Sequence, residues 1–281
     1  MIIDGKSMAE KIISEVEEQI SKIKKEYNKY PCLSIIQVGN NEASEIYIKN
    51  KISACKRAGV ISEVYKFNSE TDENEVIDCI EQTNQNTKIN AILLQLPLPE
   101  KFNRRKIMEK ILPEKDVDAF TYSNGAKIFA GDYDILPCTP SGIIHILKEI
   151  NLKLEGSKCV VIGRSEIVGK PLALALLKEN ATITICHSKT TKIKDICKKA
   201  DVLISAVGRP NLITHEMVKK NAVVIDVGIS RYNNKICGDV DFERVSEKAS
   251  HITPVPGGVG PLTVAFLIKN TFTLFKNQYF V

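Results

Sequence analysis

Hydrophobic positions along the chain alternate between helical spacing and short continuous runs. From Met8 to Tyr27 the apolar residues follow helical periodicity, which predicts an amphipathic helix with Ser7 as its candidate N-cap. We expect the next segments to be strand 32–39, helix 42–59, strand 60–67, helix 73–84 and strand 89–96. Strands that alternate with helices imply right-handed crossovers and a mostly parallel sheet. Pro97 and Pro99 end this first series, because proline suits neither a paired strand nor a helix interior.

A second series of the same kind follows. It is expected to comprise helix 141–149, strand 158–163, helix 170–180, strand 181–188, helix 193–200, strand 201–208 and strand 222–229. Its strands are almost continuously apolar, which is typical of a parallel sheet covered by helices on both faces. The closing segment 263–275 is also apolar and predicts a helix that is too short to be a domain.

These patterns predict an α/β protein of two domains with a cleft between them. A chain of 281 residues is long enough for two modest domains. Residues 1–118 are expected to form an N-terminal α/β domain with a mostly parallel sheet. Residues 119–261 are expected to form a Rossmann-like dinucleotide-binding domain, with 120–134 as the linker. Helix 262–281 is expected to pack back on the N-terminal domain.

The composition excludes several classes of protein. Hydrophobic residues make up 43% and charged residues 26%, as in soluble globular proteins. No apolar run is long enough to span a membrane, and the amphipathic start does not resemble a signal peptide, so a cytoplasmic location is predicted. The eight cysteines and four histidines are scattered without metal-ligand spacing, which predicts reduced thiols and no metal.

The net charge of +5 is spread along the chain, which does not favour nucleic-acid binding. A positive excess suits an anionic small molecule, or it serves only solubility. The charge by itself does not decide between these two interpretations.

A glycine-containing turn joins the predicted strand 158–163 to the helix that follows. It reads Gly163-Arg164-Ser165-Glu166-Ile167-Val168-Gly169. Glycines at such a junction let the backbone approach a pyrophosphate, and the free N–H groups of the helix N-terminus attract it. The pattern is GxSxxxG and not GxGxxG, so by itself it does not exclude a plain strand-to-helix turn.

The end of the next strand favours NADP over NAD. NAD enzymes usually place an acidic residue there to bind the ribose hydroxyls. This chain has His187-Ser188-Lys189-Thr190 instead, and Arg164 can reach the same place. Hydroxyls and cations can bind a ribose phosphate, which a carboxylate would repel. The same residues are also compatible with an ordinary loop that caps a helix. Ile229, at the end of strand 222–229, is expected to border the nicotinamide.

A candidate substrate site lies in the first half of the chain. Ser44, Tyr47 and Lys51 share one face of the predicted helix 42–59. Gln95 ends the strand 89–96, at the carboxyl edge where open parallel sheets bind ligands. Each residue alone could be a cap, a solvated lysine or a helix flank, but their coincidence predicts a site.

These residues carry a resemblance that covers nearly the whole chain. The sequence resembles the bifunctional methylenetetrahydrofolate dehydrogenase/methenyltetrahydrofolate cyclohydrolase family. The matching stretches are Ser44-x-x-Tyr47-x-x-x-Lys51, QLPLP from Gln95, KDVDAF from Lys115, PCTPSG from Pro137, GRSEIVGKP from Gly163, TICHSKT from Thr184, ADVLISAVGRP from Ala200, DVGIS from Asp226, GDVDF from Gly238 and TPVPGGVGPLTVAFL from Thr253. Ten ordered matches are highly specific.

The resemblance implies NADP-dependent oxidation of methylenetetrahydrofolate and hydrolysis of the methenyl product, by a homodimer that binds tetrahydrofolate derivatives between its domains. It implies a catalytic role for Lys51, with Gln95 beside it, Tyr47 packed on the pterin and Asp118 paired with the pterin N–H groups. It further implies cofactor contacts by Gly163, Arg164, Ser165, Ser188 and Ile229, and folate contacts by Ser44 and by Pro256, Gly257 and Gly258.

The chain departs from the family pattern in one place. Where the family commonly reads KDVDGFH, this chain has Ala119 and Thr121 in place of the glycine and the histidine. Asp118 is retained, so substrate binding is expected to survive. The geometry of this loop and the balance of the two activities are open at this point.

Two other functions fit the same two-domain plan. One is an NADP-dependent dehydrogenase of a small amino or hydroxy acid, such as a shikimate-type enzyme. The other is an NADP-sensing module without catalysis, in which Ala119 and Thr121 would mark decay. The intact set of Tyr47, Lys51 and Asp118 argues against decay.

Overall fold

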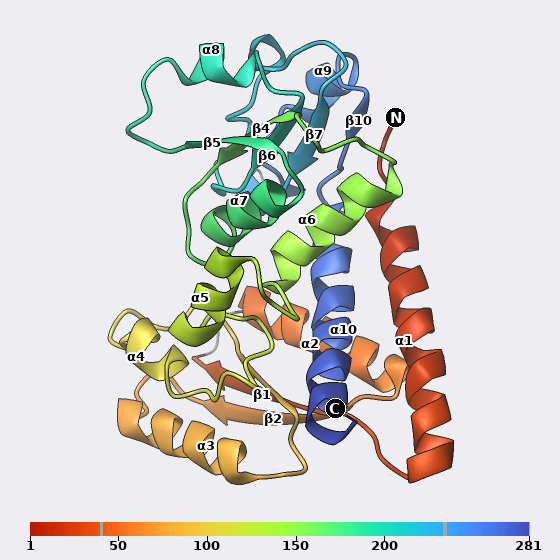
Figure 1. Cartoon of the computed structure of the whole chain (residues 1–281). Coiled ribbons are helices and arrows are strands. Elements are labelled where there is room, and N and C mark those ends of the chain that lie inside the picture. The colour runs from red at the N-terminus through yellow and green to blue at the C-terminus, as the bar shows by residue number, and fades with distance from the viewer. Residues whose placement is uncertain (40–41, 233–234, 281) are drawn as a thin grey trace. The chain divides into compact units, whose positions relative to one another are not determined.

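The computed structural model describes residues 1–39, 42–232 and 235–280. The chain divides into two compact units, whose elements are labelled in Figure 1. Unit 1 comprises Met1–Ala9, Ile128–Asp132 and Thr139–Thr263, and unit 2 comprises Glu10–Lys127, Tyr133–Cys138 and Val264–Val281. None of the described helices combines the length and the hydrophobicity that a membrane crossing requires.

Unit 2 is built on a three-stranded parallel sheet, as the alternation of elements predicts. Its elements are most of α1 (Gly5–Tyr27), then β1 (Cys32–Val38), α2 (Glu42–Ala58), β2 (Ile61–Phe67), α3 (Glu73–Gln85), β3 (Ala91–Leu94), α4 (Arg104–Met108), most of α5 (Tyr122–Ala130) and most of α10 (Val259–Tyr279). The strand order is β2–β1–β3, with both pairings parallel. The predicted mostly parallel sheet is confirmed.

The core of unit 2 follows from the two-residue period of its strands. Ile36 of β1 and Leu94 of β3 lie on one face of the sheet. There they pack against Ile80 of α3 and Met108 of α4, and all four side chains are buried. Figure 1 shows α3 and α4 beside this sheet. Burial of these alternate residues fixes the register of the strands.

The cap of the first helix differs from the prediction. Asp4, and not Ser7, precedes the first turn of α1: its side-chain oxygen accepts from the N–H of Ser7 at 3.1 Å, and its carbonyl accepts from the N–H of Met8 at 3.3 Å. Both residue types are good N-caps, so helical periodicity alone did not locate the first turn.

Unit 1 contains a five-stranded parallel sheet in the order β10–β7–β6–β4–β5. Its elements are most of α6 (Cys138–Glu149), β4 (Lys158–Ile162), α7 (Gly169–Lys178), β5 (Thr182–Cys186), α8 (Ile193–Cys197), β6 (Val202–Ser205), the 3₁₀ turn η1 (His215–Met217), β7 (Val223–Asp226), β8 (Ser230–Tyr232), β9 (Lys235–Cys237), α9 (Phe242–Ser246) and β10 (His251–Ile252). Strands β8 and β9 form a separate antiparallel pair.

Both faces of the unit 1 sheet are covered at β4, β6 and β7, as predicted from these apolar strands, whereas the edge strand β5 is mostly exposed. Val160, Leu203 and Val224 pack with Val245 of α9 and Met217 of η1 on one face. The intervening residues of β4, β6 and β7 are also buried, and α7 packs against β4 and β5 (Figure 1). Such burial on two sides is the usual setting of a parallel sheet.

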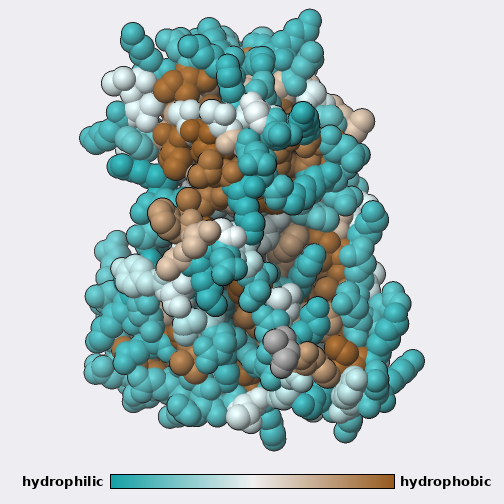
Figure 2. Space-filling model, viewed as in Figure 1, coloured by the Kyte–Doolittle hydropathy of each residue, from teal (hydrophilic) through white to brown (hydrophobic). Residues whose placement is uncertain are grey.

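Strand β5 forms one edge of this sheet and pairs with β4. Its residue Ile185 is 40% exposed, and Leu177 of the adjacent α7 is 59% exposed. Figure 2 shows hydrophobic residues gathered on the surface where β5 and α7 lie in Figure 1. An exposed apolar area around an edge strand is the kind of surface that proteins usually cover or protect.

The turn that departs from the family pattern has an unusual backbone. Ala119 has φ of 52°, in the left-handed region that glycine adopts at little cost. Its side chain is buried and its N–H donates to the carbonyl of Asp116. The hydroxyl of Thr121 accepts from the N–H of Asn124 at 3.4 Å and so caps α5. The backbone therefore explains why glycine suits position 119.

Replacing Ala119 by glycine should stabilise the protein. Ala119→Gly relieves a left-handed strain of about 1–2 kcal/mol, while the extra chain entropy of glycine and the loss of a buried methyl group offset part of it, so we expect a net gain of up to about 1 kcal/mol in the free energy of unfolding. Urea-induced unfolding measures this difference. The matched control is Ala126→Gly in the exposed interior of α5, which should lose about 1 kcal/mol. Equal losses in both variants would contradict the argument.

Candidate active site

Two segments of unit 2 bring an amide and a carboxylate to the carboxyl end of β3. Gln95 follows the last residue of β3, and its N–H donates to the carbonyl of Ile36. Ile92 of β3 forms a parallel bridge with Asp116. The chain after Asp116 thus runs beside β3 in the same direction, so Asp118 reaches the edge at which Gln95 emerges.

Lys51 meets these groups from α2. Its Nζ donates to Oε1 of Gln95 at 2.9 Å, and the Nε2 of Gln95 donates to the carbonyl of Leu96 at 2.7 Å. The second hydrogen bond orients the amide so that its oxygen points to the amine. Burial lowers the pKa of Lys51, and the negative charge of Asp118 opposes this shift. The result is an amine that gives up a proton more readily than a lysine in water.

Tyr47 lies one helical turn before Lys51 on α2. Its side chain is partly exposed, and partial burial raises the pKa of its phenol. The backbone of Ser44 lies in the same helix, but its side chain is outside the described part of the structure. Of the three residues predicted to share this helix face, the structure thus describes the side chains of Tyr47 and Lys51.

Two buried residues for which the sequence predicted no role support Asp118 and the segments next to it. The N–H of Cys138 donates to Oδ1 of Asp118 at 3.3 Å. Asn270 of α10 donates from Nδ2 to the carbonyls of Val117 at 3.0 Å and Leu136 at 2.9 Å, so it joins the two segments on either side of this contact. Cys138 lies in the matched PCTPSG stretch, and Asn270 follows the matched TVAFL. Their position in or near stretches that match the family was the only sequence feature that could have identified these two residues.

In unit 1 the predicted glycine turn has little room for side chains. Gly163 has φ of 122°, and a Cβ there would lie 2.7 Å from the carbonyl oxygen of Ala206. A Cβ on Gly169 would lie 2.3 Å from the carbonyl oxygen of Gly163. The hydroxyl of Ser165 accepts from the N–H groups of Val168 and Gly169 at the start of α7. Arg164 is exposed on this turn.

This turn lies at the point where the strand order changes direction. Strand β4 is followed in the sequence by β5 on one side, and the chain then returns to β6 on the other side. In open parallel sheets, ligands bind at such a point beyond the carboxyl ends of the strands. Gly163 follows β4 and abuts Ala206, which follows β6, so the close glycine contacts occur at the position that a dinucleotide site requires.

The other predicted cofactor and loop residues lie at the same edge. Ser188 follows β5 and is exposed, and Ile229 follows β7 and is 49% exposed. The loop with Pro256, Gly257 and Gly258 follows β10 and leads into α10. Because these strands are parallel, their carboxyl ends share one edge of unit 1. The predicted cleft between the domains stays a prediction.

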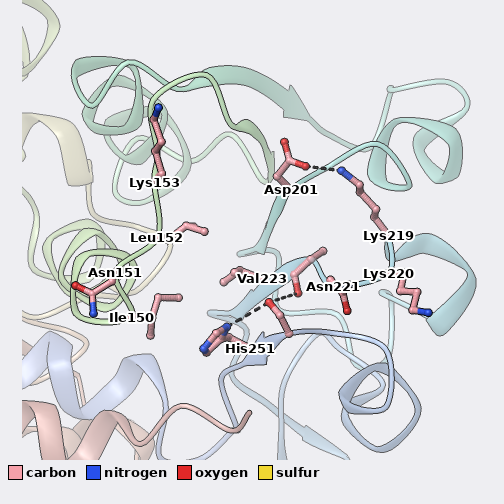
Figure 3. A pocket seen from close by; sticks show the side chains of 12 residues that line it. Ile150, Asn151, Leu152, Lys153, Asp201, Lys219, Lys220, Asn221, Val223 and His251 are labelled. Carbon is pink, nitrogen blue, oxygen red and sulfur yellow. Dashed lines mark hydrogen bonds and ion pairs between the residues drawn. The ribbon is translucent and has the colours of Figure 1, made fainter.

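A cavity of about 300 Å³ lies in unit 1, at the opposite edge. It is lined by residues that precede or begin strands, among them Asp201, Val223 and His251. Figure 3 shows Lys219 turned to Asp201, with which it forms a 2.5 Å ion pair, while Lys220 points away. None of the predicted site residues lines this cavity. It therefore contributes nothing to the candidate site.

The charge of Asp118 should control the protonation of Lys51. In Asp118→Asn the opposing charge is removed while burial remains, so the pKa of Lys51 should fall further. The pH dependence of Lys51 acylation, followed by mass spectrometry, measures this change. Asp134→Asn is the matched control, because this carboxylate is exposed and accepts from Asn277. A pKa that stays constant or rises in Asp118→Asn would contradict the pairing.

Comparison with known proteins agrees with this geometry in both halves of the chain. Residues 3–118 match the model of the tetrahydrofolate dehydrogenase/cyclohydrolase catalytic domain, and residues 137–279 match that of its NAD(P)-binding domain. A protein of Agathobacter rectalis described as bifunctional protein FolD is 49% identical, over 98% of this chain and 99% of its own.

Two solved structures are similar over almost the entire chain. The bifunctional FolD methylenetetrahydrofolate dehydrogenase/cyclohydrolase of Campylobacter jejuni has a TM-score of 0.96 and 43% identity, covering 99% of each chain. The dehydrogenase-cyclohydrolase of Trypanosoma brucei, complexed with NADP and an inhibitor, has a TM-score of 0.96 and 33% identity, covering 100% of this chain and 99% of its own. The chain belongs to the tetrahydrofolate dehydrogenase/cyclohydrolase family.

Proposed function

We propose that the chain is a bifunctional enzyme of one-carbon metabolism. It oxidises 5,10-methylenetetrahydrofolate with NADP and hydrolyses the resulting 5,10-methenyltetrahydrofolate to 10-formyltetrahydrofolate. The observation that carries this proposal is the buried amine of Lys51, hydrogen-bonded to Gln95 and influenced by Asp118, within the part of the chain that matches the family's catalytic domain.

The residues of unit 1 fit NADP. The absence of a Cβ at Gly163 and Gly169 lets the main chain of this turn pack closely, and α7 begins at the same turn, where a pyrophosphate is proposed to bind. Arg164 and Ser188, both exposed, are proposed to bind the ribose phosphate, with Ser165 at the turn and Ile229 beside the nicotinamide. When bound, NADP accepts the hydride from the methylene carbon, whose neighbouring nitrogens stabilise the cation that forms.

The hydrolytic step needs an acid–base group, and Lys51 supplies it. Water adds to the methenyl carbon and must lose a proton, and the C–N bond to one ring nitrogen then breaks as that nitrogen gains a proton. An amine with a lowered pKa can accept the first proton in its neutral form and return it to the nitrogen. Gln95 orients the amine, and Tyr47 is proposed to pack on the pterin.

Asp118 is proposed to bind the pterin through its amino and ring N–H groups, which match a carboxylate in geometry and charge. Ser44 and the Pro256–Gly258 loop complete the proposed folate contacts. The proposed folate-binding domain is residues 1–118, with helix 262–281 packed on it, and the cofactor domain is 119–261.

The lysine variant separates the two activities. Lys51→Met removes the proton-transfer group and leaves unit 1 unchanged, so hydrolysis of the methenyl substrate should slow roughly 10²- to 10⁴-fold while the Kd for NADP stays constant. Loss of the methenyl absorbance measures hydrolysis, and circular dichroism confirms the fold. Lys49→Met, an exposed lysine on the same helix, is the control. Hydrolysis that persists in Lys51→Met would reject the assignment.

The wild-type assay tests the proposal as a whole. With methylenetetrahydrofolate and NADP, NADPH should form without lasting accumulation of the methenyl product. No NADPH from the folate, together with turnover of a small amino or hydroxy acid, would support the alternative dehydrogenase instead.

Cofactor preference should respond to charge at position 188. Ser188→Asp places a carboxylate where a ribose phosphate is proposed to bind, so the ratio of NADP to NAD affinity should fall by about tenfold or more, equivalent to about 1.4 kcal/mol. Titration of each cofactor by fluorescence measures the ratio. Ser188→Asn has nearly the same size without the charge and should change the ratio much less. A similar change in both variants would contradict an electrostatic origin.

We also propose that the enzyme is a cytoplasmic homodimer. The resemblance to the family supports the dimer, and the exposed hydrophobic side chains of Leu177 and Ile185 offer surface that a partner could cover. All eight cysteines are free thiols, which suits a reducing compartment.

A further inference from the structure

Two buried carboxylates lie beneath the carboxyl edge of the unit 1 sheet, and neither belongs to the proposed cofactor contacts. Asp226 ends β7, and Asp239 follows β9. Their exposed fractions are 3% and 0%. A buried carboxylate is costly unless its oxygens are satisfied, so the partners of these two show what they hold.

Asp226 binds main-chain N–H groups from two segments. Its Oδ1 accepts from Gly228 at 3.0 Å and from Asp239 at 2.9 Å, and its Oδ2 accepts from Val240 at 2.9 Å. The N–H of Asp226 itself donates to the hydroxyl of Thr253 at 2.7 Å. This one residue therefore ties the loop after β7 to the 238–240 segment and to the start of the loop after β10.

Asp239 binds the loop after β6. Its Oδ2 accepts from the hydroxyl of Ser205 at 2.8 Å and from the N–H of Val207 at 2.9 Å, and its Oδ1 accepts from the N–H of Arg209 at 2.7 Å. Residue 206 lies between two of these donors, and its carbonyl is the group that approaches Gly163. The loop that Asp239 holds is therefore the neighbour of the proposed pyrophosphate turn.

Two glycines allow this arrangement. A Cβ on Gly228 would lie 2.1 Å from Oδ1 of Asp239, and a Cβ on Gly238 would lie 1.9 Å from Oδ2 of Asp226. The backbone thus passes directly over each carboxylate. The matched stretches AVGRP, DVGIS and GDVDF meet here, although their sequence alone predicted no role for the two aspartates.

A plain turn does not require two buried carboxylates next to each other, as Asp226 and Asp239 are here. Burial raises the pKa of Asp226 to about 6, and the neighbouring charge of Asp239 adds to the effect, against hydrogen bonds that favour the ionised form. The ionised group is thus kept at a cost in stability. Polar groups retained at such a cost often serve a defined geometry and not stability alone.

We propose that Asp226 and Asp239 are positioning residues that hold the loops after β6 and β7 in the shape that NADP binds. The inference rests on the proposed function, because it takes the carboxyl edge of unit 1 as the cofactor site. Neither carboxylate touches the cofactor in this proposal. They act through Ala206, beside the pyrophosphate turn, and through Ile229, beside the nicotinamide.

The test uses the full chain with Asp239→Asn and Asp226→Asn. In each variant an amide NH₂ faces a main-chain N–H, so the Kd for NADP should rise roughly tenfold or more. Hydrolysis of the methenyl substrate, which transfers no hydride, should stay within about twofold of wild type, because neither side chain contacts a residue proposed to bind the folate, and the N–H of Asp226 that binds Thr253 is kept in the variant.

Hydrogen exchange without cofactor reports the loops directly. The amides of Val207 and Arg209 should exchange faster in Asp239→Asn, and the amide of Gly228 should exchange faster in Asp226→Asn. A purely structural role would lower the Tm of both variants but leave the Kd for NADP, measured well below that Tm, within twofold of wild type. That result would overturn the proposal.

Ser205→Ala covers the case in which the aspartate variants fail to fold. It removes one donor to Asp239, and the Kd for NADP should rise about two- to fivefold. The matched control is Ser34→Ala in β1 of unit 2, a buried serine whose hydroxyl has no hydrogen-bond partner among the described residues, and it should leave this Kd unchanged. Equal values in the two serine variants would overturn the proposal.

These measurements separate the inference from the proposed function. A wild-type chain that binds NADP without oxidising methylenetetrahydrofolate would reject the function, while weaker NADP binding in the aspartate variants would still support the positioning role. A wild-type chain that oxidises the folate while both aspartate variants bind NADP normally would reject the positioning role alone.

Discussion

The removal of one ammonium group from water is the interaction on which the candidate site depends. Burial lowers the pKa of Lys51, and the Asp118 carboxylate and the Gln95 amide oxygen return part of the lost solvation. The amine therefore gives up its proton more readily than a lysine in water, and the positions of these groups matter as much as their charges. Each contact that positions Asp118 or Gln95 therefore affects the pKa of the Lys51 amine indirectly. The parallel run of 115–117 beside β3 and the N–H of Cys138 belong to the chemistry for this reason.

The Lys51 amine of unit 2 and the buried carboxylates of unit 1 are held by different kinds of group. The Lys51 amine faces the side chains of Gln95 and Asp118, so a single carboxylate can change its proton affinity. In unit 1 the buried carboxylates of Asp226 and Asp239 accept almost entirely from main-chain N–H groups, which are fixed by the fold. An adjustable charge suits proton transfer, whereas a charge fixed by backbone suits a binding surface that must not change shape. This difference agrees with the chemistry proposed for Lys51 and for the cofactor site.

The sequence predicts what depends on periodicity and on the rules of parallel sheets. The two sheets, their helices and the approach of Lys51 to Gln95 follow from residues close in sequence and from the shared carboxyl edge. The support of Asp118 could not be predicted in this way. Cys138 and Asn270 are separated by 132 residues and meet only in the folded chain. A buried asparagine on an apolar helix gives no local sign of the carbonyls it will bind.

The departures at positions 119 and 121 show how the turn can change while the site is kept. Ala119 strains the turn directly after Asp118, because its φ of 52° suits glycine. Thr121 acts in the opposite direction: its hydroxyl caps α5 and its N–H donates to the buried carboxylate of Asp116 at 2.8 Å. The side chain of Asp118 is held from another segment, through the N–H of Cys138. The strain therefore lowers the stability of the turn. The orientation of the Asp118 carboxylate depends on its hydrogen bond with Cys138, in which neither Ala119 nor Thr121 takes part.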